Sequence, residues 1–355
     1  MWSLSNYISQ RDRSVKTKFN FNQLIFKAIF LCLILSLISC KDNKEACAPQ
    51  PDVSGIKLSV KIQNLNDSLR KPESPEQLAA FLSRHTVLRD FFLRKPEYPS
   101  AEIFLSAQFE KYNNPYIDTI FQDVDRIFGD LSTLEEEFTS AFRHMKYYYP
   151  DFSPPKIQAA ISGFDTDLFV TDSLIIIGLD YYLGSDTKFR PGQLYDYMLR
   201  RYYPQYIVPS TILLYGISDE FNKVKPDDNT ILADMIAYGK AFYFTKHMMP
   251  CTPDSILIWY SSEEIEGARF NETKIWNHFI EEQLLFSNSH LLKRKYLDER
   301  PGTYEINEKC PGRIGTWTGW QIVKSYARKN SGSTLQQIMQ EDNAEVLFRK
   351  SGYKP

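Results

Sequence analysis

The sequence predicts a single α+β domain that is mostly helical and contains a small antiparallel sheet. Apolar residues recur at helical spacing over most of the chain after residue 56, whereas the two-residue alternation of strands is confined to a few short stretches. No internal repeat and no clear linker interrupts residues 56–355. Runs of helices on either side of a few strands favour an α+β fold over an alternating fold with a parallel sheet.

The first 39 residues predict a signal peptide. An apolar run over 28–38 follows four basic residues, Arg11, Arg13, Lys16 and Lys18. A run of this length suits the core of a signal peptide, because a membrane-spanning helix needs about 20 apolar residues.

The end of this run predicts a lipid anchor. Leu37-Ile38-Ser39-Cys40 resembles the lipobox of bacterial lipoproteins, which implies that Cys40 becomes the first mature residue and carries acyl chains such as palmitate. Several acyl chains hold a protein firmly on a membrane, whereas one chain binds only marginally. The alternative is a plain secretory signal with an incidental cysteine. Residues 40–55, which are polar and contain two prolines, predict a short tether.

The tether is followed by a predicted strand and several helices. Apolar and polar residues alternate over 56–63, which is the period of a strand. Two sequences of the capping-box type, SPEQ at 74–77 and STLE at 132–135, predict helices that continue to about 92 and 145. Between them, a proline predicts the start of a helix over 115–128.

Strand periods return in the middle of the chain. Residues 156–161 and 168–179 predict strands, and the second stretch predicts a hairpin that turns at Thr171-Asp172-Ser173. The rest of the chain predicts helices at about 193–202, 207–217, 229–249, 272–286, 315–329, 334–341 and 343–350.

Charge and cysteine content limit the classes of partner and of fold. Removal of residues 1–39, which hold five basic residues and one acidic residue, changes the formal net charge from −2 to −6. A mildly acidic chain without basic runs does not neutralise phosphates, so nucleic acid is excluded as a partner.

Outside the cytoplasm a disulfide can form, and Cys251 with Cys310 is the predicted pair because Cys47 lies in the tether.

The sequence contains no familiar catalytic motif. No histidine is followed by Glu, so H-E-x-x-H is absent, and neither G-x-S-x-G nor G-x-x-x-x-G-K-[ST] occurs. His278 and Glu281 have the spacing of one helical turn but no third ligand nearby, and Glu263, Glu264 and Glu266 are interpreted as a solvated helix face. We therefore predict no catalytic, metal-binding or cofactor-binding residue.

The stretch PGRIGTWTGWQIVKSYARKN at 311–330 predicts a helix packed into the core. Gly315 and Gly319 lie one turn apart and leave a strip where another backbone can approach, next to the bulky Trp317 and Trp320. On this interpretation Lys324 and Arg328 reach solvent. A platform on which a ligand stacks is the alternative.

Five motifs, in their order along the chain, resemble the gliding motility-associated lipoprotein B family. They are HMKYYYPDFSPPKIQAAIS, DSLIIIGLDYYLG, YIVPSTI, MIAYGKAFYF and PGRIGTWTGWQIVKSYARKN, and the likeness covers residues 56–355 behind the lipobox. The resemblance implies a lipoprotein of the cell envelope, facing the periplasm or located at the outer membrane. It also implies a requirement in gliding and an association with the type IX secretion machinery.

The same order of features is similar to a family of predicted zinc peptidases with a zincin-like fold. There, successive helices carry H-E-x-x-H, E-G-x-A and G-Y-x-x-G-Y-x-x-V. In this chain residues 207–213 contain neither His nor Glu, Tyr238 stands in place of the carboxylate, and only 315–323 keeps its pattern. The resemblance implies a degenerate zincin-like scaffold that lacks the metal ligands.

We therefore expect a lipid-anchored, non-catalytic protein that binds protein partners. A groove lined by four tyrosines is expected to hold an extended peptide: Tyr206, Tyr215, Tyr238 and Tyr243. The alternatives are an active envelope peptidase or hydrolase with an unrecognised site, and a structural spacer between membrane and cell wall.

Overall fold

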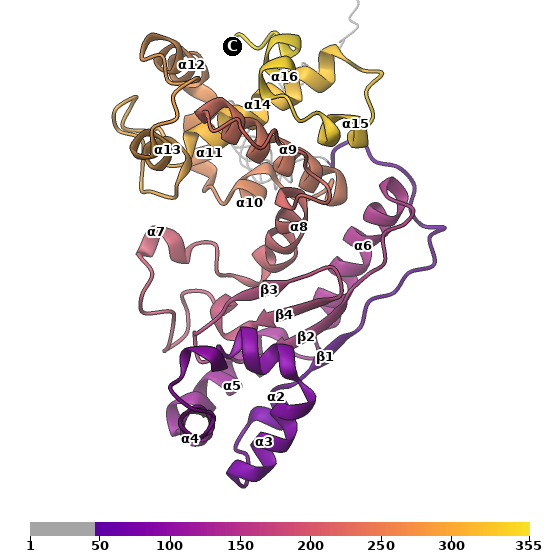
Figure 1. The fold of residues 1–355 in the computed structure, drawn as a ribbon, viewed down its shortest axis with the longest axis vertical. Coiled ribbons are helices and arrows are strands. Elements are labelled where there is room, and N and C mark those ends of the chain that lie inside the picture. Colours follow the sequence, from indigo (N-terminus) through magenta and orange to yellow (C-terminus); the bar gives the residue numbers. More distant parts are fainter. Residues whose placement is uncertain (1–46) are drawn as a thin grey trace, which may run out of the picture. The chain divides into compact units, whose positions relative to one another are not determined.

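The computed structural model describes residues 47–355, which belong to one compact unit. The predicted signal peptide and Cys40 lie outside the described residues. Within them, the predicted α+β class is confirmed: a small sheet is surrounded by helices (Figure 1). None of the helices described over 47–355 combines the length and apolar character that a membrane span needs.

The sheet has four strands in the order β1-β2-β4-β3. Its strands are β1 (Ile62–Asn64), β2 (Lys156–Ala160), β3 (Leu168–Val170) and β4 (Leu174–Gly178). The hairpin of β3 and β4 is antiparallel as predicted, but β1 pairs with β2, and β2 with β4, in parallel. The predicted antiparallel sheet is therefore wrong for two of its three strand pairs.

β1 and β2 are parallel because the chain leaves the sheet between them, whereas β2 and β4 are parallel because the chain between them reverses direction twice and forms β3 on the far side of β4. A parallel pair needs a crossover of a dozen or more residues, and helices α2 to α6 provide it between β1 and β2. The alternation of apolar and polar residues predicts where a strand lies in the sequence. It does not predict which other strand pairs with it or in which direction. The inner strands β2 and β4 are almost fully buried, as parallel strands covered on both faces usually are.

Helices cover the sheet on two sides, with α2 to α5 on one side and α8 and α9 on the other (Figure 1). The helices before the hairpin are α2 (Asn66–Leu69), α3 (Pro75–Arg84), α4 (Ala101–Asn113), α5 (Pro115–Phe128) and α6 (Ser132–Tyr148). Those after it are α7 (Asp196–Leu199), α8 (Ile207–Ile217), α9 (Ile231–Met248), α10 (Asp254–Ile258), α11 (Ser262–Phe270), α12 (Glu272–Glu281), α13 (His290–Leu297), α14 (Ile314–Lys329), α15 (Leu335–Gln340) and α16 (Ala344–Ser351).

Most predicted helices are present, and α8 has the predicted bounds. The helix predicted over 193–202 is reduced to α7, and of α11 only the start was predicted, from the acidic residues 263–266. Helices α2, α4, α10 and α13 were not predicted. Helix α4 shows why. Its apolar side chains are not confined to one face, since Ile103 is exposed while Phe104 is buried, so the helical period is weak in its sequence.

Helix α6 occupies the edge of the sheet beside β1 and shortens that strand. The backbone N–H of Val60 donates to Thr139 Oγ1 at 3.0 Å, and that of Ile62 donates to Glu135 Oε1 at 3.0 Å. Glu135 was predicted to close a capping box with Ser132, which is wrong: Ser132 is already helical, and the carboxylate of Glu135 instead binds Ile62 and Lys61. Side chains of α6 thus satisfy backbone groups that an exposed edge strand would leave open.

Candidate functional site

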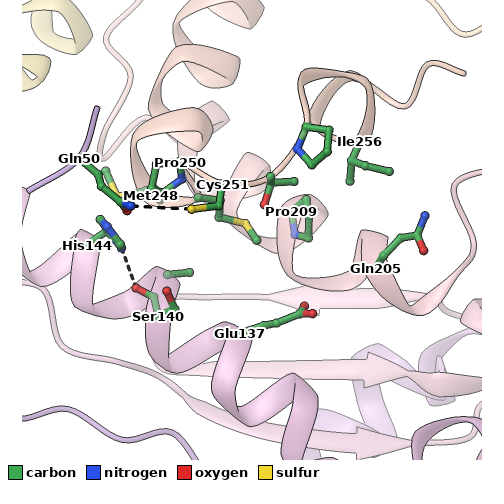
Figure 2. Close-up of a pocket in the computed structure, with 14 residues that line it drawn as sticks. Gln50, Glu137, Ser140, His144, Gln205, Pro209, Met248, Pro250, Cys251 and Ile256 are labelled. Atoms are coloured by element: carbon green, nitrogen blue, oxygen red, sulfur yellow. Dashed lines mark hydrogen bonds between the residues drawn. The ribbon is translucent and has the colours of Figure 1, made fainter. Parts of the chain in front are cut away.

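A cavity of about 510 Å³ lies between α6 on one side and α8, α9 and α10 on the other (Figure 2). The Cys47–Cys251 disulfide lies at its edge, since both Cys251 and Gln50 line it. Its lining residues are Gln50, Glu137, Ser140, Ala141, His144, Gln205, Pro209, Met248, Met249, Pro250, Cys251, Thr252, Pro253 and Ile256.

Helix α6 supplies the polar side of this cavity through His144. The side chain is only 3% exposed, and its Nδ1 lies 2.9 Å from the carbonyl oxygen of Ser140. A carbonyl oxygen only accepts, so Nδ1 carries a proton, and Nε2 accepts a hydrogen bond whenever it carries none. Among the described residues Nε2 has no hydrogen-bond partner. Buried polar atoms are rarely left unpaired, so this covered nitrogen lacks a donor that the described residues do not supply.

Glu137 lies two turns before His144 on the same helix and lines the same cavity. Burial raises the pKa of its carboxyl group above the ordinary value. A carboxyl with a raised pKa accepts hydrogen bonds when ionised and donates one when protonated. The two groups are about 10 Å apart along α6, so they belong to different ends of the cavity wall.

The opposite wall is apolar and contains Pro209, Met248 and Ile256. Methionine adapts its shape to irregular ligands, and proline adds a rigid apolar surface. This wall also contains Cys251. Its sulfur is part of the disulfide and is therefore not a nucleophile. An apolar wall facing a few hydrogen-bonding groups is the usual make-up of a binding pocket.

The described residues bring no three His, Cys, Asp or Glu side chains together in a way that could hold a metal ion. The histidines lie apart and have separate surroundings. His247 Nδ1 lies 2.8 Å from the carbonyl oxygen of Tyr243, His278 Nε2 lies 2.8 Å from Tyr296 Oη, and His85 packs on the ring of Phe81.

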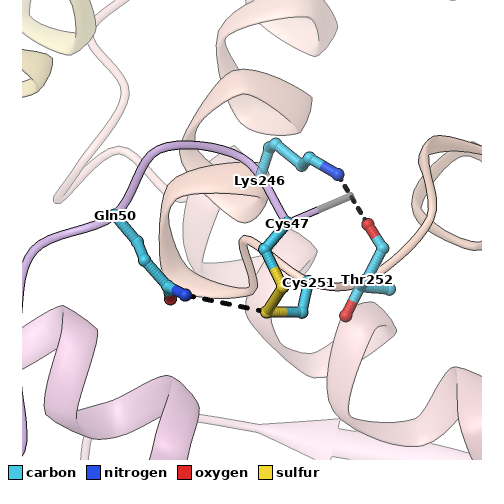
Figure 3. Close-up of a disulfide and its surroundings, with 5 residues drawn as sticks. All are labelled: Cys47, Gln50, Lys246, Cys251 and Thr252. Carbon is cyan, nitrogen blue, oxygen red and sulfur yellow. Dashed lines mark hydrogen bonds between the residues drawn. A yellow bond between two sulfur atoms is a disulfide. The ribbon is translucent and has the colours of Figure 1, made fainter. Parts of the chain in front are cut away.

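The disulfide joins Cys47 to Cys251, and the predicted pair of Cys251 with Cys310 is wrong (Figure 3). Cys310 is a buried free thiol. The backbone N–H of Ala48 also donates to Pro250 O at 2.9 Å, and Gln50 Nε2 lies 3.8 Å from Cys251 Sγ. Part of the predicted tether is therefore fastened to the folded unit. The prediction excluded Cys47 as a disulfide partner because its neighbours in the chain are polar. Polar neighbours carry no information about what the segment contacts.

Reduction of this disulfide is expected to lower the free energy of unfolding by about 2–4 kcal/mol, because the crosslink limits the unfolded chain. Comparing urea unfolding of the folded domain with and without reductant measures the change. The double variant Cys47→Ser/Cys251→Ser should match the reduced protein and should no longer respond to reductant. Equal midpoints in all four samples would show that the crosslink contributes nothing.

The helix expected to carry zinc ligands in a zincin-like fold faces a smaller cavity. Residues Ser210, Leu214 and Ile217 of α8 line a space of about 250 Å³ with Leu168 of β3. They contribute one hydroxyl group and apolar side chains. Trp259 closes the far side, with Arg201 stacked on its ring at 4.6 Å. These side chains provide no imidazole and no thiolate.

The expected tyrosine groove is not present as predicted. Tyr206 and Tyr215 lie at opposite ends of α8, which at about 1.5 Å per residue places them on the order of 13 Å apart. Tyr215 donates to Thr171 O at 3.0 Å and lines a different cavity, beside Tyr148 and Phe152. Tyr243 packs on His247. Residue type alone did not show which faces of α8 and α9 are turned toward each other.

The predicted packing stretch forms α14, which lies against α9 through glycines. A Cβ atom on Gly319 would lie 1.8 Å from Met235 O, and one on Gly239 would lie 2.4 Å from Gly319 O. Trp317 and Trp320 are 2% and 0% exposed, so both indoles are core residues and not a platform for a ligand. The backbones of α9 and α14 are in direct contact here.

Lys324 of α14 reaches solvent only in part, since its side chain is 27% exposed. Its Nζ lies 3.8 Å from the centre of the Trp320 ring and donates to Asp254 Oδ2 at 2.7 Å. Burial alone would raise the pKa of Asp254, but the ammonium groups of Lys324 and Lys246 hold that pKa below its ordinary value. This ion pair joins α14 to the start of α10, directly after the disulfide loop.

Comparison with known proteins identifies the family. Residues 46–355 match the family model described as gliding motility protein GldB. The chain belongs to this family. The match covers the whole described structure and confirms the predicted family resemblance, and it indicates a lipoprotein that takes part in gliding motility. No curated protein and no solved structure matches the chain.

Proposed function

We propose that this member of the gliding motility protein GldB family is anchored to the cell envelope by lipid on Cys40 and acts in gliding by binding a protein partner. We place it with the type IX secretion machinery. On this proposal the scaffold is a degenerate zincin-like fold that binds without catalysing a reaction. The observation that supports binding most directly is the cavity on α6, where the buried Nε2 of His144 has no partner among the described residues.

The occupant that fits this cavity is a segment of polypeptide with an apolar side chain next to a hydrogen-bond donor. The apolar side chain would lie on Pro253 and Ile256, and the donor would have to reach His144 Nε2, which other atoms cover in the free protein. A backbone N–H of the bound segment is such a donor. The cavity volume lies within the range of small-ligand pockets, so it would accept one or two side chains of a partner and not a whole domain.

His144→Leu is expected to abolish gliding while the protein still folds. Leucine keeps an apolar side chain in the buried position, loses only the hydrogen bond to Ser140 O, and removes the acceptor that the partner would use. His278→Ala is the matched control, because His278 lies away from the cavity, and that strain should glide. Gliding of the His144→Leu strain at the wild-type rate, with normal amounts of folded protein, would disprove the proposed site.

Zinc content and peptide cleavage, measured on the purified domain, test the proposal that the protein is not a catalyst. Zinc content should remain far below one ion per chain, and a mixture of peptides should not be cleaved, because zinc catalysis needs about three protein ligands and a general base. Tightly held zinc in a 1:1 ratio, or specific cleavage, would favour an active envelope peptidase instead.

A further inference from the structure

We infer that the face of the folded unit around the Cys47–Cys251 disulfide is held against the lipid surface to which the protein is anchored. This inference rests on the proposed lipid at Cys40 and adds a fixed orientation to it. The disulfide face is defined by Cys47, Tyr147 and Cys251. The occupant of this face is the bilayer.

The chain between the proposed lipid and the disulfide is short. Cys40 and Cys47 are seven residues apart, and a fully extended chain spans at most about 3.6 Å per residue, which gives a reach of about 25 Å. A compact unit of about 310 residues has a radius of gyration of about 19 Å and hence a diameter of about 50 Å. The lipid attachment can therefore not reach around to the opposite side of the unit.

The disulfide limits how far the lipid on Cys40 can lie from the folded unit, because it fixes the chain to the unit already at Cys47. Without it, residues 47–57 are held to the body mainly by the single backbone bond from Ala48 to Pro250 and by weak side-chain contacts. The next firm attachment is at Leu58 and Val60, whose backbone groups bind Arg143 and Thr139 of α6. The eighteen residues from Cys40 to Leu58 would reach about 65 Å, which exceeds the diameter of the unit.

The side chains on the disulfide face suit the headgroup region of a membrane. Tyr147, near the end of α6, is 50% exposed, and an exposed tyrosine combines an apolar ring with a hydroxyl that stays hydrated. The neighbouring Tyr148 packs on His247 at 5.7 Å between ring centres, which places Tyr147 close to the α9 end that precedes Cys251. The mature chain carries a formal net charge of −6, so attraction to anionic headgroups is not what orients it. The covalent attachment sets the orientation.

Photo-crosslinking to lipid tests this orientation in the full, lipidated chain. Tyr147 and Tyr116 are replaced one at a time by benzoylphenylalanine, and each protein is placed on vesicles of phosphatidylethanolamine and phosphatidylglycerol. Tyr116 is the matched control because it is 63% exposed and belongs to α5, on the other side of the sheet (Figure 1). We expect several-fold more crosslinking to lipid from position 147 than from position 116, and a ratio close to one in the Cys47→Ser/Cys251→Ser background.

The outcomes separate this inference from the proposed function. If the wild-type chain does not bind vesicles, or if Cys40→Ala binds them equally well, the proposed lipid anchor is wrong. If binding depends on Cys40 but positions 147 and 116 crosslink equally, the anchor stands and the fixed orientation is overturned. If the excess at position 147 persists without the disulfide, the disulfide is not what holds this face to the membrane.

Discussion

Gly319→Val is expected to lower the free energy of unfolding by about 3 kcal/mol or more, at the upper end of the usual cost of overpacking. Even the first carbon of the new side chain would lie 1.8 Å from Met235 O, 2.4 Å from Met235 C and 3.0 Å from Met235 Cα. These are backbone atoms of α9, which cannot move aside as a flexible side chain can. Helix propensity acts in the opposite direction by only about 1 kcal/mol or less, so packing decides the sign.

Urea unfolding of the purified domain measures this loss, and Gly332→Val is the matched control. A Cβ atom on Gly332 would meet nothing within 4 Å, and the residue lies in the turn between α14 and α15, so the control should change stability little. Gly319→Ala should already be clearly destabilising. A Gly319→Val protein that melts at or above the wild-type temperature would show that α9 and α14 do not approach as described.

The stability of the wild-type domain is expected to increase by about 3 kcal/mol, relative to a Lys240→Met variant, between pH 8 and pH 10.5. Lys240 is 1% exposed, and burial lowers the pKa of its amine to about 8, although Glu341 and Asp342 act to raise it. Between the two pKa values the unfolded chain binds a proton that the folded chain has released. Stability therefore rises with pH in this window, by about 1.36 kcal/mol per unit of pKa difference.

The comparison with Lys240→Met isolates one lysine, because titration of the buried tyrosines affects both proteins alike. Lys240 Nζ donates to the carbonyl oxygens of Lys223 and Glu341 at 2.5 and 2.8 Å, so the variant should also be less stable at pH 10.5, where these acceptors have lost their donor. Lys223→Met is the control at a more exposed lysine. The same substitution there should leave the pH dependence unchanged. A difference between wild type and Lys240→Met that stays constant from pH 7 to pH 10.5 would contradict the lowered pKa.

The candidate site was predicted less well than the fold. Nothing in the sequence near His144 marks it as special, because a buried histidine on an amphipathic helix is a common core residue. Its unpaired Nε2 becomes visible only when the segments around it are in place, and two of these, the disulfide loop and the start of α8, are more than 60 residues away in the chain. Cys47 was missed for the same reason.

The sequence by itself determined the helices with strong apolar period, the hairpin of β3 and β4, and the close backbone approach at Gly319. Each of these features depends on residues close together in the chain. The spacing of such residues determines which side chains lie on the same face of a helix or strand. The tertiary structure alone decided the parallel pairing of β1, β2 and β4, the disulfide from Cys47 to Cys251, and the ion pair of Lys324 with Asp254. These features join segments from about 20 to 200 residues apart, and local spacing carries no information about which distant segment supplies the partner.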